Sequence, residues 1–571
     1  MSKKQISYNT LTTPFEKELS EIPFAEYPRP CMRRESYLTL NGRWALSVFR
    51  KKKEIYSGSI LVPFVPESKI SGVCCNFPSD AVLCYSRSFD IPESFVKDRV
   101  LIHFGAVDRY ASVKVNGIQV CTHDGGYLPF SADITDALKK GESNLLEVEC
   151  TDPLDAAYPY GKQCKKRGGM WYTPISGIWQ SVWLESVYED HIEGLEITSN
   201  IRSVTVKVIG GKKSKTLSLE LDGRIREYNF ITDEITVHIP DGRLWSPDDP
   251  YLYSFAVTSG NDRIESYFAL REVSVGKNKN KPCILLNKKA IFLHGLLDQG
   301  YFSDGIYLPA TSEGYKKDIL TMKKLGFNML RKHIKIEPEL FYYYCDKYGM
   351  LVCQDMVNSG KYNFLIDTAI PTIGMKKGIS HRASKKRRRI FEESARLTQK
   401  LLYNHPSVIY YTIFNEGWGQ YDADRIYGEL KSLDPTRIYD ATSGWFTEKK
   451  SDVESLHVYF KPFKVEKEYR RPIVLSEFGG YSYKIPEHSF NLSKTYGYKL
   501  FDNKEDFEAA LETLYRKEII PAIDKGLCAA VLTQVSDVED ETNGLFTYDR
   551  QVLKIDEKKM KNISEDIYRS F

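Results

Sequence analysis

The chain has 571 residues, too many for one hydrophobic core, and at ~100–200 residues per domain we expect about three domains. Apolar residues make up 42% and charged residues 27%, close to globular averages, which excludes a disordered or fibrous chain. The 80 basic and 76 acidic residues leave a net charge of only +4, so composition gives no support for nucleic acid or a membrane surface as a partner.

Cellular location and redox state can also be predicted. The first residues are basic but lack the apolar stretch of a signal peptide, and no apolar run reaches the ~18 residues of a membrane span. The 11 cysteines are odd in number and form no CxxC pair, which favours free thiols in a reducing compartment. We therefore expect a cytoplasmic protein with no metal, disulfide or cofactor, and we leave a homo-oligomer open.

The first part of the chain, residues 1–187, is predicted to form a jelly-roll-like β-sandwich. Short runs of alternating apolar and polar residues, such as 100–104, are separated by turn residues. Asn116-Gly117 lies between two such runs and is a strong signal for a hairpin turn. Residues 188–275 contain a second, smaller group of such runs, which fits an immunoglobulin-like β-sandwich acting as a spacer.

The pattern changes in residues 276–571, where short apolar runs alternate with helical stretches such as 312–325 and 384–403. Eight such units in about 295 residues fit the size and count of a (β/α)8 TIM barrel. An open doubly wound sheet shows similar alternation and is the alternative fold. The eight expected strands are 291–296, 327–333, 350–355, 408–414, 438–442, 455–459, 473–478 and 529–535.

Two segments after the third expected strand stand out. Residues 385–389 are all basic, and since a helical pattern follows, we interpret them as the solvated start of a helix rather than as a nucleic-acid arm. The 357–390 loop is long and has few structure signals. Loops of that length are usually functional, so this one is a candidate wall for a site at the barrel mouth.

Glutamates follow or end two of the barrel strands. A TIM barrel carries its chemistry at the carboxyl ends of its strands. Glu416 follows the fourth expected strand and Glu477 lies at the end of the seventh, each between an apolar run and a glycine-containing loop. A single strand-end glutamate is more often an exposed, inert acid. Two of them, both at the mouth of one barrel, instead predict a catalytic pair.

A pair of carboxylates suits the hydrolysis of glycosides. Burial raises the pKa of a carboxyl group, and a second carboxylate nearby raises it further, so one member can stay protonated near neutral pH. In a retaining mechanism one carboxylate attacks the anomeric carbon while the other protonates the leaving oxygen, with the two groups ~5–5.5 Å apart. We predict Glu477 as the nucleophile and Glu416 as the general acid/base.

The motifs resemble those of glycoside hydrolase family 2, which comprises β-galactosidases, β-glucuronidases and β-mannosidases. Phe414-Asn415-Glu416-Gly417 is similar to the acid/base motif of the family, and Ser476-Glu477-Phe478-Gly479 is similar to its nucleophile motif. The resemblance extends over nearly the whole chain and implies a retaining, exo-acting β-glycosidase with a sugar-binding-type first domain. Further matching segments are 27–30, 40–44, 125–130, 177–185, 244–247 and 250–253.

The same resemblance implies roles for six further residues. Asn415 is expected to bind the sugar 2-hydroxyl, His333 to contact the substrate and Tyr459 to orient the nucleophile. The alternative for His333 and Tyr459 is that they are packed core residues. Less specifically, we expect Asp298 to form hydrogen bonds with outer sugar hydroxyls. Trp418 and Trp445 are expected to stack on a sugar ring or, as the alternative, to line the barrel rim.

The sequence departs from the family pattern in ways that bear on the substrate. β-Glucuronidases of this family carry an Asn-x-Lys motif whose lysine pairs with the substrate carboxylate, but residues 541–550 contain no lysine there. Gln534 also departs from the aromatic residue that is usual at its position. We therefore expect a neutral sugar and a β-galactosidase-like activity.

Two alternatives stay open. A β-glucuronidase or galacturonidase would need another cation near the sugar, from Lys332, Lys335 or residues 385–389. A non-catalytic carbohydrate-binding protein is the alternative of another class. It is less favoured because both glutamates and Asn415 are present.

Overall fold

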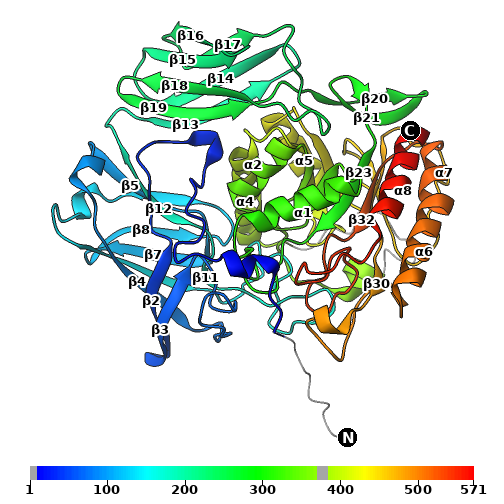
Figure 1. Cartoon of the computed structure of the whole chain (residues 1–571), viewed down its shortest axis with the longest axis horizontal. Coiled ribbons are helices and arrows are strands. Elements are labelled where there is room, and N and C mark those ends of the chain that lie inside the picture. Colours follow the sequence, from blue (N-terminus) through cyan, green and yellow to red (C-terminus); the bar gives the residue numbers. More distant parts are fainter. Residues whose placement is uncertain (1–9, 370–382) are drawn as a thin grey trace, which may run out of the picture.

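The structure of the protein is a computed structural model and describes residues 10–369 and 383–571. Three bodies of structure follow one another along the chain: a β-sandwich in blue and cyan, a second β-sandwich in teal and green, and a barrel with helices around it (Figure 1). This arrangement confirms the predicted fold class. The positions of the two domain boundaries, after residues 187 and 275, stay predictions.

The first sandwich consists of a four-stranded sheet, β1-β12-β5-β9, packed against a six-stranded sheet, β3-β2-β4-β10-β7-β8. Apolar residues on alternate positions of both sheets form its core, with Trp44, Val113 and Leu184 among them. The predicted hairpin is present, because Asn116 and Gly117 join β7 to β8 with φ angles of 52° and 81°. The strands are β1 (Leu38–Thr39), β2 (Gly42–Arg50), β3 (Lys53–Val62), β4 (Val82–Phe89), β5 (Arg99–Phe104), β7 (Tyr110–Val115), β8 (Ile118–Asp124), β9 (Phe130–Asp133), β10 (Asn144–Thr151) and β12 (Val182–Val187), with the short pair β6 (Val107–Asp108) and β11 (Gly177–Ile178).

The second sandwich is smaller. A three-stranded sheet, β13-β14-β17, faces a four-stranded sheet, β16-β15-β18-β19, over a core of its own. Its seven antiparallel strands fit the expected immunoglobulin-like size. They are β13 (Ile192–Ser199), β14 (Ser203–Gly210), β15 (Lys215–Leu221), β16 (Arg224–Phe230), β17 (Glu234–His238), β18 (Tyr253–Ser259) and β19 (Asp262–Phe268).

The last part of the chain contains eight parallel strands in the order β27-β26-β25-β24-β23-β32-β29-β28. Between the two outermost of these, the amide of His457 donates to the carbonyl of Gly444 at 3.3 Å, which brings β28 beside β27 and closes the sheet into a barrel. Each of the eight expected runs overlaps one strand. The strands are β23 (Leu293–Asp298), β24 (Met329–Lys332), β25 (Leu351–Asp355), β26 (Val408–Asn415), β27 (Ile438–Ser443), β28 (Glu454–Val458), β29 (Ile473–Gly479) and β32 (Leu527–Thr533).

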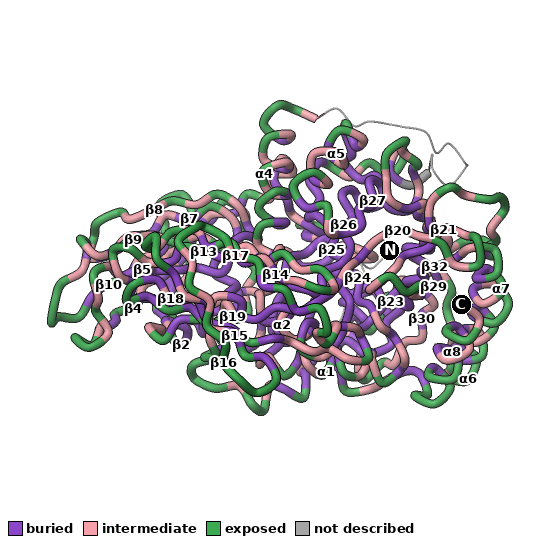
Figure 2. Tube along the Cα trace, turned by 90° about the horizontal axis from the view of Figure 1, so that it is seen from above, coloured by how far each residue is buried: buried purple, intermediate pink, exposed green. Residues whose placement is uncertain are grey.

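Helices cover most of the barrel, and both predicted helical stretches are present as α1 and α4. Residues 444–453 and 459–472, which connect β27, β28 and β29, contain no helix, so the barrel departs there from eight regular βα units. Figure 2 shows buried residues along the barrel strands and exposed ones along the helices. The helical segments of the barrel part are α1 (Glu313–Lys324), α2 (Glu339–Tyr348), η5 (Leu365–Ala369), α4 (Lys385–Leu402), α5 (Ala423–Leu433), η6 (Pro486–His488), α6 (Lys504–Leu514), η7 (Tyr515–Ile519), α7 (Ile520–Ile523) and α8 (Glu557–Ser570).

A small sheet closes the amino-terminal end of the barrel. It consists of β20 (Val273–Asn278), β21 (Lys281–Leu286) and β22 (Lys289–Ala290). Its apolar side chains pack with those at the beginnings of the barrel strands, so this end is filled by core. The carboxyl ends of the strands are therefore the end that can hold a site.

The basic run begins α4, as predicted. The side chain of Ser384 caps the helix by accepting a hydrogen bond from the amide of Arg387 at 3.2 Å. Lys385, Lys386 and Arg389 are exposed, whereas Arg387 is buried and donates to backbone carbonyls. No helix within residues 10–369 and 383–571 is long and apolar enough to cross a membrane. Residues 370–382 of the long loop lie outside the described residues.

Candidate active site

A pocket lies at the carboxyl ends of the barrel strands. Three parts of the molecule form its wall: the strand ends, the loops that follow them, and a segment of the first sandwich. The strand ends contribute Leu297, His333, Asn415, Glu416, Tyr459, Glu477 and Thr533; the loops contribute Tyr362, Asp367, Trp418, Tyr498 and Glu541; and the sandwich contributes Lys162 and Met170. The expectation that the long loop walls this site holds for its described residues Tyr362 and Asp367.

Glu416 sits at a sharp turn of the backbone directly after β26. Its φ angle is 51°, in the left-handed region that a non-glycine residue adopts at a free-energy cost of ~1–3 kcal/mol. Gly417 and Gly419 continue the turn with φ angles of 65° and 67°, and the amide of Glu416 donates to the carbonyl of Ser443 at 2.7 Å. The turn places the carboxyl group in the pocket, with 16% of the side chain exposed.

Glu477 lies within β29 and is held by donors on both oxygens. Arg331 donates to Oε1 at 3.0 Å, and the hydroxyl of Tyr459 donates to Oε2 at 2.6 Å. Arg331 is fixed in turn, because its Nε donates to Asp355 at 2.9 Å. The charge-assisted bonds hold the Glu477 carboxylate in one orientation.

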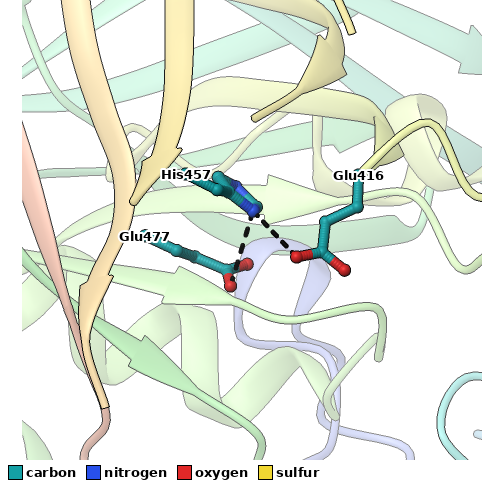
Figure 3. Close-up of side chains that lie close together, drawn as sticks. All are labelled: Glu416, His457 and Glu477. Carbon is teal, nitrogen blue, oxygen red and sulfur yellow. Dashed lines mark hydrogen bonds and ion pairs between the residues drawn. The ribbon is translucent and has the colours of Figure 1, made fainter. Parts of the chain in front are cut away.

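His457 connects the two glutamates, as Figure 3 shows. Its Nδ1 lies 3.1 Å from Oε1 of Glu416 and 3.6 Å from Oε2 of Glu477. Because both neighbours are carboxyl oxygens, Nδ1 carries a hydrogen and donates toward them. The ligand-type atoms of all three residues lie within 4.8 Å of one another, so the two carboxyl groups are close enough for a retaining mechanism, which needs ~5–5.5 Å.

The two carboxyl groups have opposite pKa shifts. Burial is the largest influence on Glu416 and raises its pKa; the negative charge of Glu477 raises it further, while the hydrogen bond from His457 opposes the shift. Burial also acts to raise the pKa of Glu477, but the charges of His457 and Arg331 and the bond from Tyr459 outweigh it and lower that pKa to about 2. The pair therefore favours a protonated Glu416 beside a charged Glu477.

Asn415 and His333 are oriented by the same buried ion network. The side-chain oxygen of Asn415 accepts from Arg331 at 2.7 Å, which leaves its amide N–H groups for the pocket. His333 has its Nδ1 2.9 Å from Asp355, and burial lowers the pKa of this histidine to about 4. Since the neutral ring donates through Nδ1 to the carboxylate, Nε2 is left as an acceptor.

The three less specifically predicted residues, Asp298, Trp418 and Trp445, differ in their position relative to the pocket. Trp418 lines the pocket and packs edge-on against Trp171 of the sandwich, with ring centroids 4.9 Å apart. Asp298 is not in the pocket wall; it is buried and bonded to Lys332 at 2.8 Å, which neutralises its charge within the core. Trp445 is also outside the pocket wall, and its ring centroid lies 6.3 Å from that of His457.

The cations that a uronic-acid substrate would need are not where the sequence suggested. Lys332 pairs with Asp298 and with Glu337 at 2.6 Å, and Lys335 pairs with Glu337 at 2.8 Å. Neither of these lysines, and none of residues 385–389, lines the pocket. Among the described residues, Lys162 is the one lysine or arginine in the pocket wall.

Several site residues are not among the predicted ones. Arg331 and His457 precede His333 and Tyr459 by two positions, and side chains two apart point to the same side of a strand. That spacing could have identified both. Lys162 and Met170 reach the pocket from another domain, and no local sequence signal indicates such a contact.

Glu416, His457 and Glu477 also form a group with the ligand types of a metal site. Arg331 and Tyr459 already bond the carboxylate oxygens of Glu477. A guanidinium so close would repel a divalent cation, so this arrangement suits hydrogen bonding and proton transfer better than metal binding.

A barrel whose mouth holds two carboxyl groups this close together, one with a raised pKa and one with a lowered pKa, has the geometry of a glycoside hydrolase. Comparisons with known proteins agree. The family description "Glycosyl hydrolases family 2, sugar binding domain" matches residues 76–187, and "Glycosyl hydrolases family 2, TIM barrel domain" matches residues 278–553. Together the matches span more than half of the sequence, and the chain belongs to glycosyl hydrolases family 2.

Individual relatives differ in their substrates. A β-galactosidase of Priestia megaterium (strain DSM 319 / IMG 1521) is 26% identical over 459 residues, which cover 73% of this chain but only 42% of that longer protein. A β-glucuronidase of Chlorocebus aethiops is 24% identical over 467 residues, covering 69% of this chain and 68% of that one. The solved structure of a β-D-glucuronidase from Dictyoglomus thermophilum shares the fold, with a TM-score of 0.73 at 19% identity, covering 95% of this chain and 98% of that one.

Proposed function

We propose that the protein is a retaining exo-β-glycosidase in which Glu477 is the nucleophile and Glu416 is the general acid/base. The observation that carries this proposal is the pair of opposite pKa shifts in two carboxyl groups that each have an oxygen within 4.8 Å of an oxygen of the other. Each group is thereby prepared for a different half of a double displacement.

In the first step the Glu477 carboxylate attacks the anomeric carbon while Glu416 gives its proton to the leaving oxygen. In the second step the ionised Glu416 takes a proton from water, which attacks the same carbon and releases Glu477. Asn415, with its amide N–H groups free, is placed to hold the sugar 2-hydroxyl, a contact that strengthens in the transition state. His333 offers an acceptor and Trp418 a flat apolar face to the same sugar.

An exo-acting enzyme fits the walls of the pocket. The strand ends form its base, and Lys162 and Met170 of the sandwich together with Tyr362 and Asp367 of the long loop enclose it on other sides. An enclosed pocket accepts a terminal sugar, whereas an open groove would accept the middle of a chain. The sandwich segment therefore contributes to selection of the chain end.

We propose a neutral, galactose-like sugar as the substrate. The support is that Lys332, Lys335 and residues 385–389 are engaged or distant, and that one similar relative is a β-galactosidase. A β-glucuronidase or galacturonidase is the second candidate, favoured by the presence of Lys162 in the pocket wall and by the relatives named β-glucuronidase. A protein that only binds carbohydrate would have no need for the paired, oppositely shifted carboxyl groups.

Nitrophenyl β-glycosides of galactose, glucose, mannose, arabinose, glucuronic acid and galacturonic acid test this function. We expect turnover of at least one neutral β-glycoside of this panel. The corresponding nitrophenyl α-glycosides, tested in parallel, should not be hydrolysed. Proton NMR during the reaction should show the β-anomer of the product first, because two displacements retain the configuration. Formation of the α-anomer first would contradict the retaining mechanism.

A second test concerns Tyr459, whose hydroxyl donates to Glu477 at 2.6 Å. Replacing Tyr459 with phenylalanine removes a hydrogen bond to a charged group, worth ~1.5–3 kcal/mol, so kcat should fall ~10- to 150-fold. The bond lowers the pKa of Glu477, so its loss should raise that pKa and move the acid side of the pH profile to higher pH. An unchanged pH profile would show that the hydroxyl does not act on Glu477.

A further inference from the structure

Besides the catalytic pair, the buried carboxyl groups of Asp367 and Glu541 line the pocket, and the mechanism above uses neither. Glu541 lies in the segment that follows β32, and only 3% of the residue is exposed. The negative charges of Glu416, Glu477 and Glu541 all act to raise the pKa of Tyr498, which lines the same pocket. Burial of a charged carboxyl group costs free energy, because the charge is removed from water, and a function in the pocket would account for that cost.

The hydrogen bonds around Glu541 all run in one direction. The side-chain amide of Gln534 donates to the oxygen of Asn543 at 2.7 Å, so the N–H groups of Asn543 point the other way, and one donates to Oε1 of Glu541 at 3.0 Å. The hydroxyl of Tyr172, from the first sandwich, donates to Oε2. The chain of donors therefore ends on a carboxylate that can only accept.

No lysine, arginine or histidine lies within 4 Å of the Glu541 oxygens in the part of the chain that the structure describes, so its charge is held by neutral donors alone. Each carboxylate oxygen has a second lone pair, and Glu541 lines the pocket, so a ligand in the pocket can donate to its carboxylate. A ligand at this place must supply O–H donors. A ligand carboxylate would instead meet the charges of Glu541 and Glu477.

We propose that Glu541 determines the specificity of the enzyme: its carboxylate accepts hydrogen bonds from hydroxyl groups of the terminal sugar and excludes uronic acids. This inference rests on the proposed glycosidase function and names the residue that selects the substrate class. Lys162 lies in the same wall, but its charge acts on Glu416 and His333, and it forms no ion pair with Glu541 among the described residues, so the charge of Glu541 remains in place.

The test uses two matched pairs of nitrophenyl substrates that differ only at C6: β-glucoside with β-glucuronide, and β-galactoside with β-galacturonide. We expect wild type to prefer the neutral member of the pair it hydrolyses by at least ~100-fold in kcat/KM. Glu541→Gln keeps the shape but removes the charge, and the preference should shrink at least ~10-fold. The double variant Glu541→Asn with Asn543→Lys makes the charge of the site more positive by two units, and the preference for the neutral substrate should shrink further.

Glu539→Gln is the matched control. Glu539 lies in the same segment, is equally buried and is bonded to the sandwich through the amide of Thr173 at 2.8 Å, but it does not line the pocket. Its replacement can loosen the segment and lower all rates, but the ratio between neutral and acidic substrates should stay as in wild type. Thermal melting of each variant shows whether it is folded.

The outcomes separate this inference from the proposed function. If wild type is active and the ratio of kcat/KM between neutral and acidic substrates is unchanged in Glu541→Gln, the inference is overturned but the proposed function stands. A preference of wild type for uronides has the same consequence. If wild type hydrolyses no glycoside, the proposed function fails. Calorimetric titration with glucose and with glucuronate then still tests the inference. It requires that wild type binds glucose more tightly than glucuronate and that this difference is smaller in Glu541→Gln. Equal binding of the two sugars by wild type overturns it.

Discussion

Replacing Glu477 with glutamine is expected to lower kcat on the best nitrophenyl glycoside by about 10 000-fold or more, the scale of losing a covalent nucleophile. Glutamine has nearly the same shape, and its amide oxygen can still accept from Arg331 while its amide N–H donates to the Tyr459 hydroxyl, but a neutral amide cannot attack the anomeric carbon. The measurement is the steady-state rate of nitrophenol release by purified wild type and variant.

Glu508→Gln provides the control for this loss. Glu508 is a buried acid of α6 that binds Lys559 at 2.6 Å, on the outer helices of the barrel, so its replacement tests general destabilisation without touching the site.

For the smaller variant Glu477→Ala, added azide should restore product formation and yield the α-glycosyl azide, since azide then attacks in place of the carboxylate. Wild-type rates in Glu477→Gln would exclude Glu477 as the nucleophile.

Replacing Glu416 with alanine is expected to have effects that depend on the leaving group. Dinitrophenol leaves without a proton, so bond cleavage on dinitrophenyl glycosides should change little, whereas glycosides of simple alcohols should lose ~100- to 10 000-fold in kcat/KM. The comparison requires a series of substrates whose leaving-group pKa increases stepwise. A loss that is equal for all leaving groups would show that Glu416 is not the proton donor.

The pH dependence gives an independent check of the same residue. In the proposed mechanism the enzyme is active while Glu416 is protonated and Glu477 is ionised. Because burial raises the pKa of Glu416, kcat/KM of wild type should fall as the pH rises through that raised value, and the acid side should lie near the pKa of Glu477, about 2, if the fold persists there. Glu416→Ala should lose the fall at high pH, and persistence of that fall would contradict the assignment.

The architecture of this chain could be predicted because its periodicities are local. Strands of the first sandwich alternate at period two, the Asn116-Gly117 turn fixes a hairpin, and eight apolar runs mark the barrel. The location of Glu416 and Glu477 at the barrel mouth follows from the same pattern. Absence of a helix in residues 444–453 and 459–472 could not be predicted, since a barrel closes through its strands and tolerates irregular connections there.

The chemistry of the site depends on contacts that the sequence does not display. Arg331 lowers the pKa of Glu477 from β24, which is separated from β29 by the strands β23 and β32, and His457 contacts both glutamates. Asp298 is predicted as a site residue from its position at the carboxyl end of a strand, where it is the last residue of β23, but it pairs with Lys332 of the adjacent strand and does not line the pocket. Strand-end position indicates which residues face the mouth, whereas ion pairing decides which of them remain accessible there.

The most direct measurement is the identification of the carboxyl group that becomes bound to the sugar. Dinitrophenyl 2-deoxy-2-fluoro-β-glycosides of galactose and glucose react rapidly at the first step and slowly at the second, so the intermediate accumulates and a digested sample can be sequenced by mass spectrometry. The structure predicts a single fluorosugar on Glu477. A sugar attached to Glu416 or Glu541, or an active enzyme that never acquires a label, would contradict the double displacement proposed for this pocket.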